Sequence, residues 1–396
     1  MKRTATALTL CLLAACATKP APADDPVAQL EALVRARPED ASLRYVLAML
    51  EERGGRPERA LARLQELLGL GWDYALDDSD FPRTRALKGY SEVAAELARR
   101  EPKVIRGEVA RVLAERDIRS EGIAWDPEAR AFYLGHAAGR GVMVVPLDGA
   151  VRPLALPGPG DMLAPLGMKV DPATRTLWVA SVAFPLMGGY TDADAGHSRL
   201  VAVDLRSGAA RLSLALGDAN APSLLNDLAL LPGGRVVVTD SQSGALYAAD
   251  LEATTLRVLA PPGSFESPNG IAADDAGATL YVADMFGLAA VDPTTGTVRR
   301  LQAPARSTLG GVDGLSFASG RLVGIQNLFG APRIWSVEAS ASGLGAPTIL
   351  SSSDPRLVGP TTGVIVEGAL WLIANPQLRA TASDEPEDLQ LLRIPL

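Results

Sequence analysis

The sequence contains few of the side chains on which thiol, disulfide and zinc chemistry depends. Among its 396 residues there are only two cysteines and two histidines. Both cysteines, Cys11 and Cys16, lie within the first sixteen residues. The rest of the chain therefore has no disulfide and no thiol nucleophile, and its stability must come from the packing of side chains.

A cluster of basic residues is missing as well. The formal net charge is −8 at pH 7, and no run of Lys or Arg follows Lys2 and Arg3. Because nucleic-acid binding depends on clustered Lys and Arg, we expect no nucleic-acid partner. The length predicts two or three domains, the 47% of hydrophobic residues provide for a sizeable core, and 38 Gly with 29 Pro favour a turn-rich β protein.

The N-terminus has the pattern of a targeting segment. Two basic residues precede an apolar run over residues 5–15, which is too short to span a bilayer. The run ends in "LAAC", which resembles a bacterial lipoprotein signal. We expect a signal peptide over residues 1–15 and a lipidated Cys16 on a tether over residues 16–26. This would anchor the protein at the cell envelope, at the outer membrane facing the periplasm in a Gram-negative bacterium. An ordinary secretory leader and a short membrane anchor are the alternatives.

Residues 27–100 show the apolar spacing of α-helices, with Pro57 at an expected helix start. Five positions resemble those of a tetratricopeptide unit: Tyr45, Ala48, Gly55, Ala60 and Leu64. A plain helical hairpin is the alternative. Units of this kind bind peptides or pack on a neighbouring domain, so we expect a peptide or protein partner here and no catalytic residue.

From about residue 104 the sequence repeats a unit of an apolar strand, a tight turn and a second apolar strand. Six copies follow one another about 43 to 60 residues apart. They begin with "SEGIAWD", "LGMKVD", "NDLALL", "NGIAAD", "DGLSF" and "TTGVIV". Six four-stranded units of this length predict a six-bladed β-propeller over residues 104–396. The fold class is therefore mainly β, with a small helical domain in front.

A propeller closes by pairing the two ends of its chain within one blade. The last strand of this chain is "LQLLRIPL", at the C-terminus. We expect it to be the third strand of blade six, with residues 107–115 as the fourth.

In each repeat one position precedes the innermost strand by one or two residues. Around the ring this position holds Glu121, Leu166, Asn226, Asn269, Asp313 and Thr361 or Thr362. We expect all six to point at the central axis. Two carboxylates and two amide oxygens in one place are ligands for a hard cation, most simply Ca²⁺, with Zn²⁺, Mn²⁺ and Mg²⁺ as alternatives. Neither Cys nor His accompanies them, which disfavours a structural zinc site.

The opposing interpretation is local. Asn-Gly and Asp-Gly are common turn dipeptides, because they tolerate left-handed backbone angles. Taken singly, Asn269-Gly270 and Asp313-Gly314 fit turns better than ligands. Glu121 forms turns poorly and yet occupies the same position, which favours the metal.

The repeat motifs resemble those of the gluconolactonase, regucalcin and luciferin-regenerating-enzyme family, whose relatives include squid-type diisopropylfluorophosphatase and paraoxonase. "SEGIAWDPE" matches at Glu121, "NDLAL" at Asn226, "SPNGIA" at Asn269 and "VDGLSF" at Asp313, and the resemblance covers roughly residues 118–375. It implies a divalent ion held by these four residues. Paraoxonases use a histidine pair as base, whereas Leu166 stands where the first would be expected.

A second set of residues follows the first by 13 to 15 positions, at the ends of the second strands: His136, Ser181, Asp240, Asp284, Asn327 and Asn375. We expect it to surround the mouth of the same pocket. His136 is its one base that titrates near neutral pH, and a solvated turn histidine is the alternative. His197 lies in an insertion of blade two, which is either a lid or a surface loop.

These features predict a metal-dependent hydrolase of lactone or ester bonds that acts on a small molecule in the propeller pocket. Asp313 is the candidate general base or nucleophile, with His136 as a second candidate. The alternative is a non-catalytic propeller lipoprotein, a binding or scaffold module with a structural ion or none.

Overall fold

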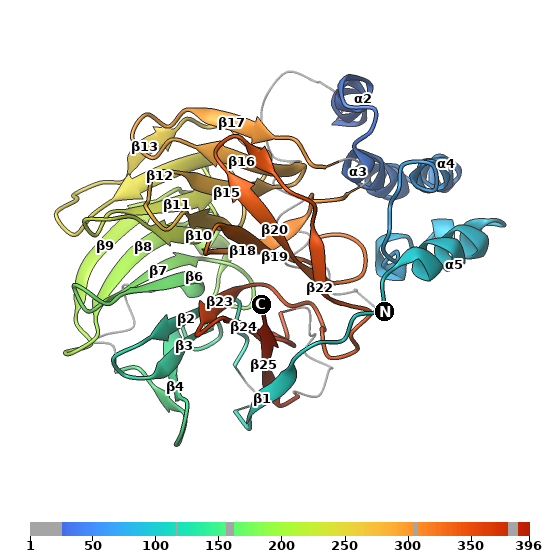
Figure 1. Ribbon diagram of the computed structural model, residues 1–396. Helices are drawn as coiled ribbons and strands as arrows, with labels where there is room; N and C mark the ends of the chain where they lie inside the picture. Colours follow the sequence, from blue (N-terminus) through green and yellow to red (C-terminus); the bar gives the residue numbers. More distant parts are fainter. Residues whose placement is uncertain (1–25, 116–117, 156–161, 305–306, 379–386) are drawn as a thin grey trace.

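The structure is a computed structural model of the chain, and it describes residues 26–115, 118–155, 162–304, 307–378 and 387–396 (Figure 1). The expected signal peptide, the lipidated Cys16 and nearly all of the tether lie outside these residues. Within the described ranges, no helix is both long enough and apolar enough to cross a membrane.

The N-terminal domain is helical, as the spacing of its apolar residues predicts. Its helices are α2 (Pro26–Ala36), α3 (Ala41–Arg53), α4 (Pro57–Leu67) and α5 (Tyr90–Arg100), with short 3-10 turns η2 (Asp78–Asp80) and η3 (Thr84–Ala86). Asp40 caps α3 by accepting a hydrogen bond from the Ser42 amide, and Pro57 is the first residue of α4. The resemblance to a tetratricopeptide unit stays a prediction.

The rest of the chain forms six antiparallel sheets around a central axis, which confirms the six-bladed β-propeller (Figure 1). Blade one consists of β2 (Ile123–Asp126), β3 (Ala131–His136), β4 (Gly141–Pro146) and β5 (Arg152–Pro153). Blade two consists of β6 (Ala164–Asp171), β7 (Thr176–Val182), β8 (Ser198–Asp204) and β9 (Ala210–Leu216). Blade three consists of β10 (Leu225–Leu230), β11 (Val236–Asp240), β12 (Ala245–Ala249) and β13 (Arg257–Ala260).

Blade four has the same plan, and blade five carries an extra short strand. Blade four consists of β14 (Ile271–Ala273), β15 (Leu280–Asp284), β16 (Gly287–Val291) and β17 (Val298–Leu301). Blade five consists of β18 (Val312–Ala318), β19 (Arg321–Gln326), β20 (Arg333–Ser340), β21 (Gly343–Leu344) and β22 (Thr348–Ser352).

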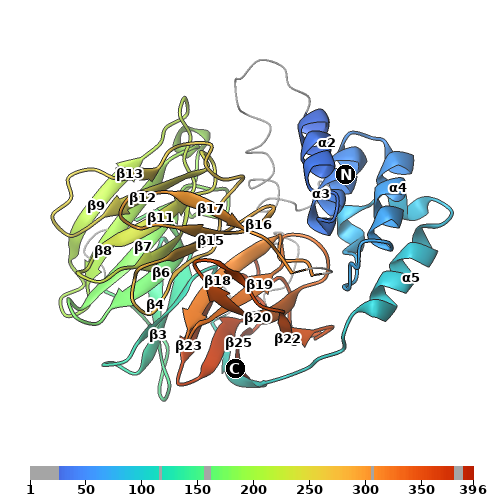
Figure 2. The same ribbon diagram turned by 45° about the horizontal axis from the view of Figure 1, so that its top comes forward.

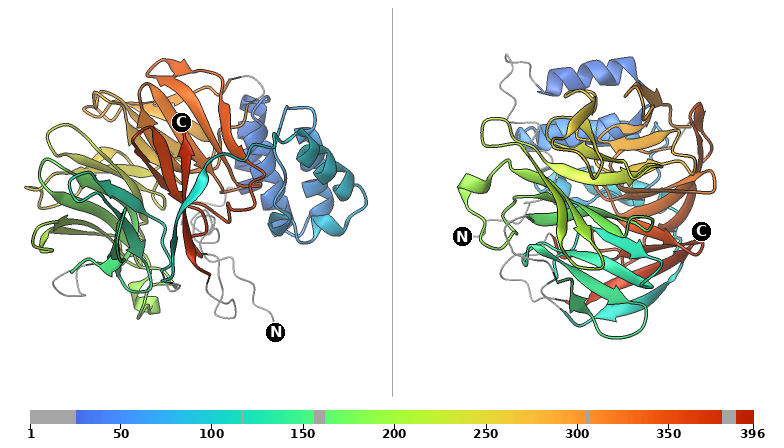
Figure 3. Two further views of the ribbon diagram at one scale, coloured as in Figure 1. Left: turned by 60° about the horizontal axis from the view of Figure 1, so that its bottom comes forward. Right: turned by 90° about the vertical axis from the view of Figure 1, so that its left-hand side faces the viewer.

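Blade six closes the ring with strands from both ends of the propeller. It contains β23 (Gly363–Val366), β24 (Ala369–Ile373), β25 (Leu389–Pro395) and, on its outer edge, β1 (Glu108–Leu113). β1 pairs with β25 from Glu108 opposite Arg393 to Leu113 opposite Leu389, and the two strands lie side by side in Figure 3. The predicted closure is confirmed.

Apolar side chains fill the space between each pair of neighbouring blades. Six separate clusters do this, one for each junction of the ring. In the first, Val144 of blade one packs with Val179 of blade two. The core of the propeller is therefore divided among the blade interfaces, and the axis is left for the ends of the innermost strands.

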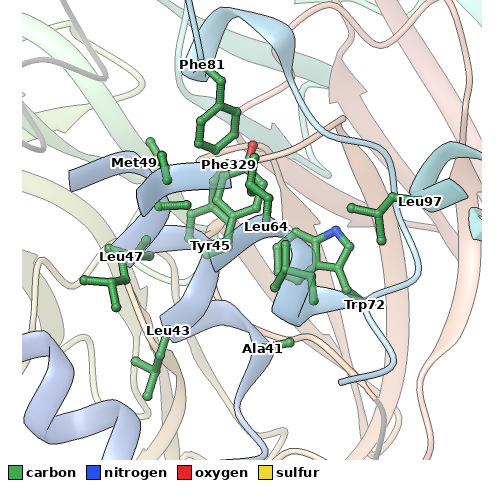
Figure 4. Close-up of a cluster of buried hydrophobic side chains, with 14 of the residues drawn as sticks. Ala41, Leu43, Tyr45, Leu47, Met49, Leu64, Trp72, Phe81, Leu97 and Phe329 are labelled. Carbon is green, nitrogen blue, oxygen red and sulfur yellow. The ribbon is translucent and has the colours of Figure 1, made fainter. Parts of the chain in front are cut away.

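A further apolar cluster joins the helical domain to the propeller (Figure 4). The helices lie beside the propeller in Figure 2. Tyr45 of α3 stacks on Trp72 with ring centroids 4.9 Å apart, and on Phe329 of blade five at 5.2 Å. Met285 of blade four is buried in the same cluster. The helical domain thus packs on its neighbour, which is one of the two roles expected of it.

Candidate metal centre

The six ring positions gather where the innermost strands begin. Each of these strands, β2, β6, β10, β14, β18 and β23, contacts the next one around a complete circuit. Glu121 and Asn269 precede their strands by two residues, as expected. Leu166, Asn226 and Asp313 instead lie inside theirs, which corrects the predicted placement. The reason is a break in the strand register at each of these three positions, and an irregularity of this kind redirects a side chain.

The glycines that follow the ring positions serve close packing and not turns. Gly122, Gly167, Gly270 and Gly314 all lie outside the set of positive-φ residues, so the turn interpretation of Asn269-Gly270 and Asp313-Gly314 is wrong. A Cβ added at Gly270 would lie 2.7 Å from both the Asp313 carbonyl oxygen and the Leu315 amide nitrogen. Added at the other three glycines, it would likewise meet backbone of the next blade. Only glycine allows the strand ends to approach this closely.

Hydrogen bonds complete the circuit at the remaining junctions. The hydroxyl groups of Thr361 and Thr362 both donate to the Glu121 carbonyl oxygen, at 2.8 and 2.5 Å, and so join blade six to blade one. The Thr239 hydroxyl donates to the Asn269 carbonyl oxygen at 2.9 Å and joins blade three to blade four. The backbone that carries the candidate ligands is therefore held around the whole ring.

The side chains of the four candidate ligands are buried. Glu121, Asn226, Asn269 and Asp313 are each at most 4% exposed. Among the residues that the structure describes, Glu121 Oε2, Asn226 Oδ1 and Asn269 Oδ1 have no hydrogen-bond partner. A buried polar atom without a partner costs free energy, so three such oxygens in one ring are the atoms that a cation would satisfy.

The electrostatics show that carboxylates from different blades come close together at the axis. Burial, and then the carboxylates of Asp313 and Asp227, raise the pKa of Glu121 well above its usual value of 4.5. These three acids come from blades one, five and three. Without a counter-charge the charged form of the Glu121 carboxyl is therefore disfavoured, and a bound cation would favour loss of the proton.

Asp227 was missed by the sequence analysis. It is buried, accepts hydrogen bonds from the amides of Leu228 at 2.8 Å and Ile271 at 3.3 Å, and lies 3.4 Å from Lys169 Nζ. It occupies the position that is glycine in four other repeats, so an acid where its counterparts are glycine was the available signal. Its bond to Ile271 links blade three to blade four beside Asn269.

The blade-two side of the ring is apolar. Leu166 is buried with Phe184 and Met187 of the insertion that follows β7, and the Gly188 amide donates to the Ala138 carbonyl oxygen of blade one at 3.1 Å. The insertion thus packs at the same end of the propeller as the ring. His197 Nδ1 lies 3.1 Å from the Asp194 carbonyl oxygen within this loop, and its role as a lid residue stays a prediction.

The second set of residues lies at the ends of the second strands, as expected. Several of its polar atoms bond to backbone: the Asp240 carboxylate accepts from the Leu224 amide at 2.8 Å, and Asn375 Oδ1 accepts from the Gln390 amide at 2.8 Å. Three further members of the set also bond to backbone through their side chains: Ser181, Asp284 and Asn327. These five side chains therefore hold strand ends and loops, and their contact with a substrate stays a prediction.

His136 is the last residue of β3 and is half-buried. Its ring packs against Gly139, where a Cβ would meet it. The hydrogen bonds of its backbone place it at the end of the second strand, outside the inner ring. A catalytic role for His136 stays a prediction.

The donor set suits a hard cation. In the described part of the chain, no group of three or more His, Cys, Asp and Glu side chains could hold a metal ion, so a centre at this ring must use the two amide oxygens as well. Carboxylate and amide oxygens are the ligands that Ca²⁺ takes, usually six to eight with water included. The four residues supply donors of this kind.

No family model matches the chain, and no curated protein matches it. Among solved structures, the PQQ-bound aldose sugar dehydrogenase of Streptomyces coelicolor aligns with a TM-score of 0.51 and 14% identity, over 73% of this chain and 97% of that one. A luciferin-regenerating enzyme aligns at 0.50 and 14%, over 74% and 96%. A gluconolactonase of Xanthomonas campestris aligns at 0.49 and 19%, over 74% and 95%. Likeness at such identities shows the fold alone.

Proposed function

We propose that this protein is a divalent-metal-dependent hydrolase of lactone or ester bonds, anchored at the bacterial cell envelope through a lipid on Cys16. The observation that supports it is the set of buried oxygens without partners on Glu121, Asn226 and Asn269, beside the Asp313 carboxylate that helps to raise the pKa of Glu121. A cation of charge +2 would satisfy these oxygens and neutralise the two acids. Ca²⁺ fits the all-oxygen set best.

The four candidate ligands and Asp227 each have a role in this proposal. Glu121, Asn226, Asn269 and Asp313 hold the cation, and the tight backbone circuit keeps them in place. The cation, when bound, supplies a Lewis acid for an ester or lactone carbonyl and a means of activating water. Asp313 accepts the proton of the attacking water as general base. Asp227, bonded to two backbone amides, holds the strand ends that carry Asn226 and Asn269.

The test begins with metal-free protein. Ca²⁺, Mn²⁺, Mg²⁺ and Zn²⁺ are each titrated by calorimetry, and a panel of lactones and aryl esters is assayed with the preferred metal and with a chelator. Asp313→Asn keeps the size of the side chain and one oxygen ligand. It should lower kcat by about 10²–10⁴ through loss of the base and should also weaken metal binding.

Asp126→Asn is the matched control. Asp126 is also a buried acid on an innermost strand, but it lies at the opposite end of β2 and forms an ion pair with Arg175 at 2.6 Å. Its loss should destabilise the fold and leave kcat within about threefold of the parent.

Metal binding without hydrolysis of any substrate would favour the alternative, a binding module with a structural ion. Absence of metal binding would remove the hydrolase and leave a binding or scaffold module without an ion. Labelling with a fatty acid, lost in Cys16→Ala, tests the anchor.

A further inference from the structure

The helical domain packs on the end of the propeller that carries the candidate metal centre. The Asn269 amide donates to the Ala283 carbonyl oxygen at 2.8 Å, and Met285, two residues further, is buried in the cluster formed with the helices. The Leu328 amide donates to the Gly311 carbonyl oxygen at 3.3 Å, and Leu328 belongs to the same cluster. The helices therefore contact the loops next to two of the four candidate ligands.

One side chain of blade five joins the helical domain to the segment that leads to Asp313. Arg333, the first residue of β20, is buried. Toward the helical domain its guanidinium donates to Asp73 Oδ1 at 2.8 Å and lies 4.0 Å from the centre of the Tyr74 ring. Toward the propeller it donates to Gln326 Oε1 at 2.7 Å and to the Thr308 carbonyl oxygen at 2.9 Å.

The segment 308–311 is enclosed between these partners. Gln326 Nε2 donates to the carbonyl oxygens of Thr308 at 3.1 Å and Gly310 at 2.7 Å. On the other side, a Cβ added at Gly310 would lie 2.7 Å from the Ser42 hydroxyl of α3. β18 begins directly after this segment, and Asp313 is its second residue. The path from the helices to the ligand is short and made of buried contacts.

We propose that the helical domain sets the position of Asp313, with Arg333 as the positioning residue. The inference rests on the proposed metal centre and extends it to the helices. An arginine is required because its planar fork of donors bonds to Asp73, Gln326 and Thr308 at once, whereas the single ammonium group of lysine cannot reach all three. The helical domain is then a fixed part of the site.

The test measures the Ca²⁺ dissociation constant of the full-length protein by calorimetry, at a temperature at which circular dichroism shows each variant folded. Arg333→Lys keeps the charge and should weaken Ca²⁺ binding about 10-fold or more, the usual effect of removing a partner that orients a metal ligand. Asp73→Ala alters only the helical side of the contact and should weaken binding in the same direction, by less. Because Asp73 is partly exposed, this variant keeps the test valid if Arg333→Lys fails to fold.

Arg175→Lys is the matched control. Arg175, like Arg333, is buried, and it bonds to both oxygens of Asp126, at 2.6 and 2.7 Å, at the opposite end of β2. It should lower the melting temperature and leave the dissociation constant within about twofold. Unchanged Ca²⁺ binding in both Arg333→Lys and Asp73→Ala, or an equal loss in Arg175→Lys, would overturn the positioning role and leave the proposed hydrolase intact. A parent protein that binds no divalent cation would instead overturn the metal centre, and this inference with it.

Discussion

The close approach of neighbouring strands at the axis can be tested with a single methyl group. Gly270 stands between the candidate ligands Asn269 and Asp313. A Cβ added there would lie 2.7 Å from the Asp313 carbonyl oxygen and the Leu315 amide nitrogen, where ordinary contact begins at 3.4 Å. All these atoms belong to backbone, so no side-chain rotation relieves the clash. In Gly270→Ala, blades four and five must separate by about 0.7 Å at this point.

Two effects follow from that separation. Crowding of a packed interior costs roughly 1–3 kcal/mol, and for a chain of this size that lowers Tm by about 1–4 °C. The shift also exceeds the spread of about 0.3 Å over which Ca²⁺–oxygen distances vary. Because Asn269 and Asp313 flank the clash, Gly270→Ala should weaken Ca²⁺ binding about 10-fold or more. Calorimetry measures both effects: the melting temperature is recorded in the presence of a chelator, and the Ca²⁺ dissociation constant is obtained by titration.

Gly343→Ala is the control for the loss of a glycine. Its φ also lies outside the positive range, and no heavy atom of the described residues lies within 4 Å of a Cβ built there. Its stability should stay within about 0.5 kcal/mol of the parent, as for an ordinary surface change. The reasoning would be refuted if Gly270→Ala matched Gly343→Ala in both Tm and Ca²⁺ affinity.

Three further predictions concern the ring and its acids. Deletion of residues 389–396 removes β25, which pairs with both β24 and β1, so cooperative unfolding should be lost; melting as sharp as that of the parent would place the closure elsewhere. The pKa of Glu121 in the folded protein is raised above 4.5. The stability that the protonated side chain contributes is therefore present at and below pH 4.5 and is lost as the pH rises toward the folded pKa. The loss is about 1.4 kcal/mol for each pH unit that separates the folded from the unfolded pKa. In a chelator, Glu121→Gln should therefore be more stable than the parent at pH 8 and about equal to it at pH 4. Urea unfolding that shows no difference in stability at pH 8 would contradict the burial of a protonated acid. His136→Ala should keep kcat within about 10-fold of the parent, since the residue lies outside the inner ring; a larger loss than that of Asp313→Asn would make His136 the base.

The repeat pattern was enough to predict the blades and their closure. A blade is a local unit whose strands alternate with turns along the chain, so each copy carries its own signal. The pairing of residues 107–115 with the C-terminus followed because the last repeat lacked a fourth strand. The inner positions Glu121, Asn226, Asn269 and Asp313 could be found for the same reason, since each stands at an equivalent place in its repeat.

What the sequence by itself determined is therefore the mainly β, six-bladed architecture, the helices in front of it, and the oxygen-bearing positions where the innermost strands begin. The tertiary structure alone decided the rest. Gly270 has the sequence signature of a turn, and its purpose appears only where the next blade's backbone meets it. Asp227 joins the site because the Ile271 amide of the next blade and the Glu121 carboxylate lie near it. The contact of Arg333 with Asp73 links residues 260 positions apart. Such contacts depend on distance in space, and no local pattern along the chain encodes them.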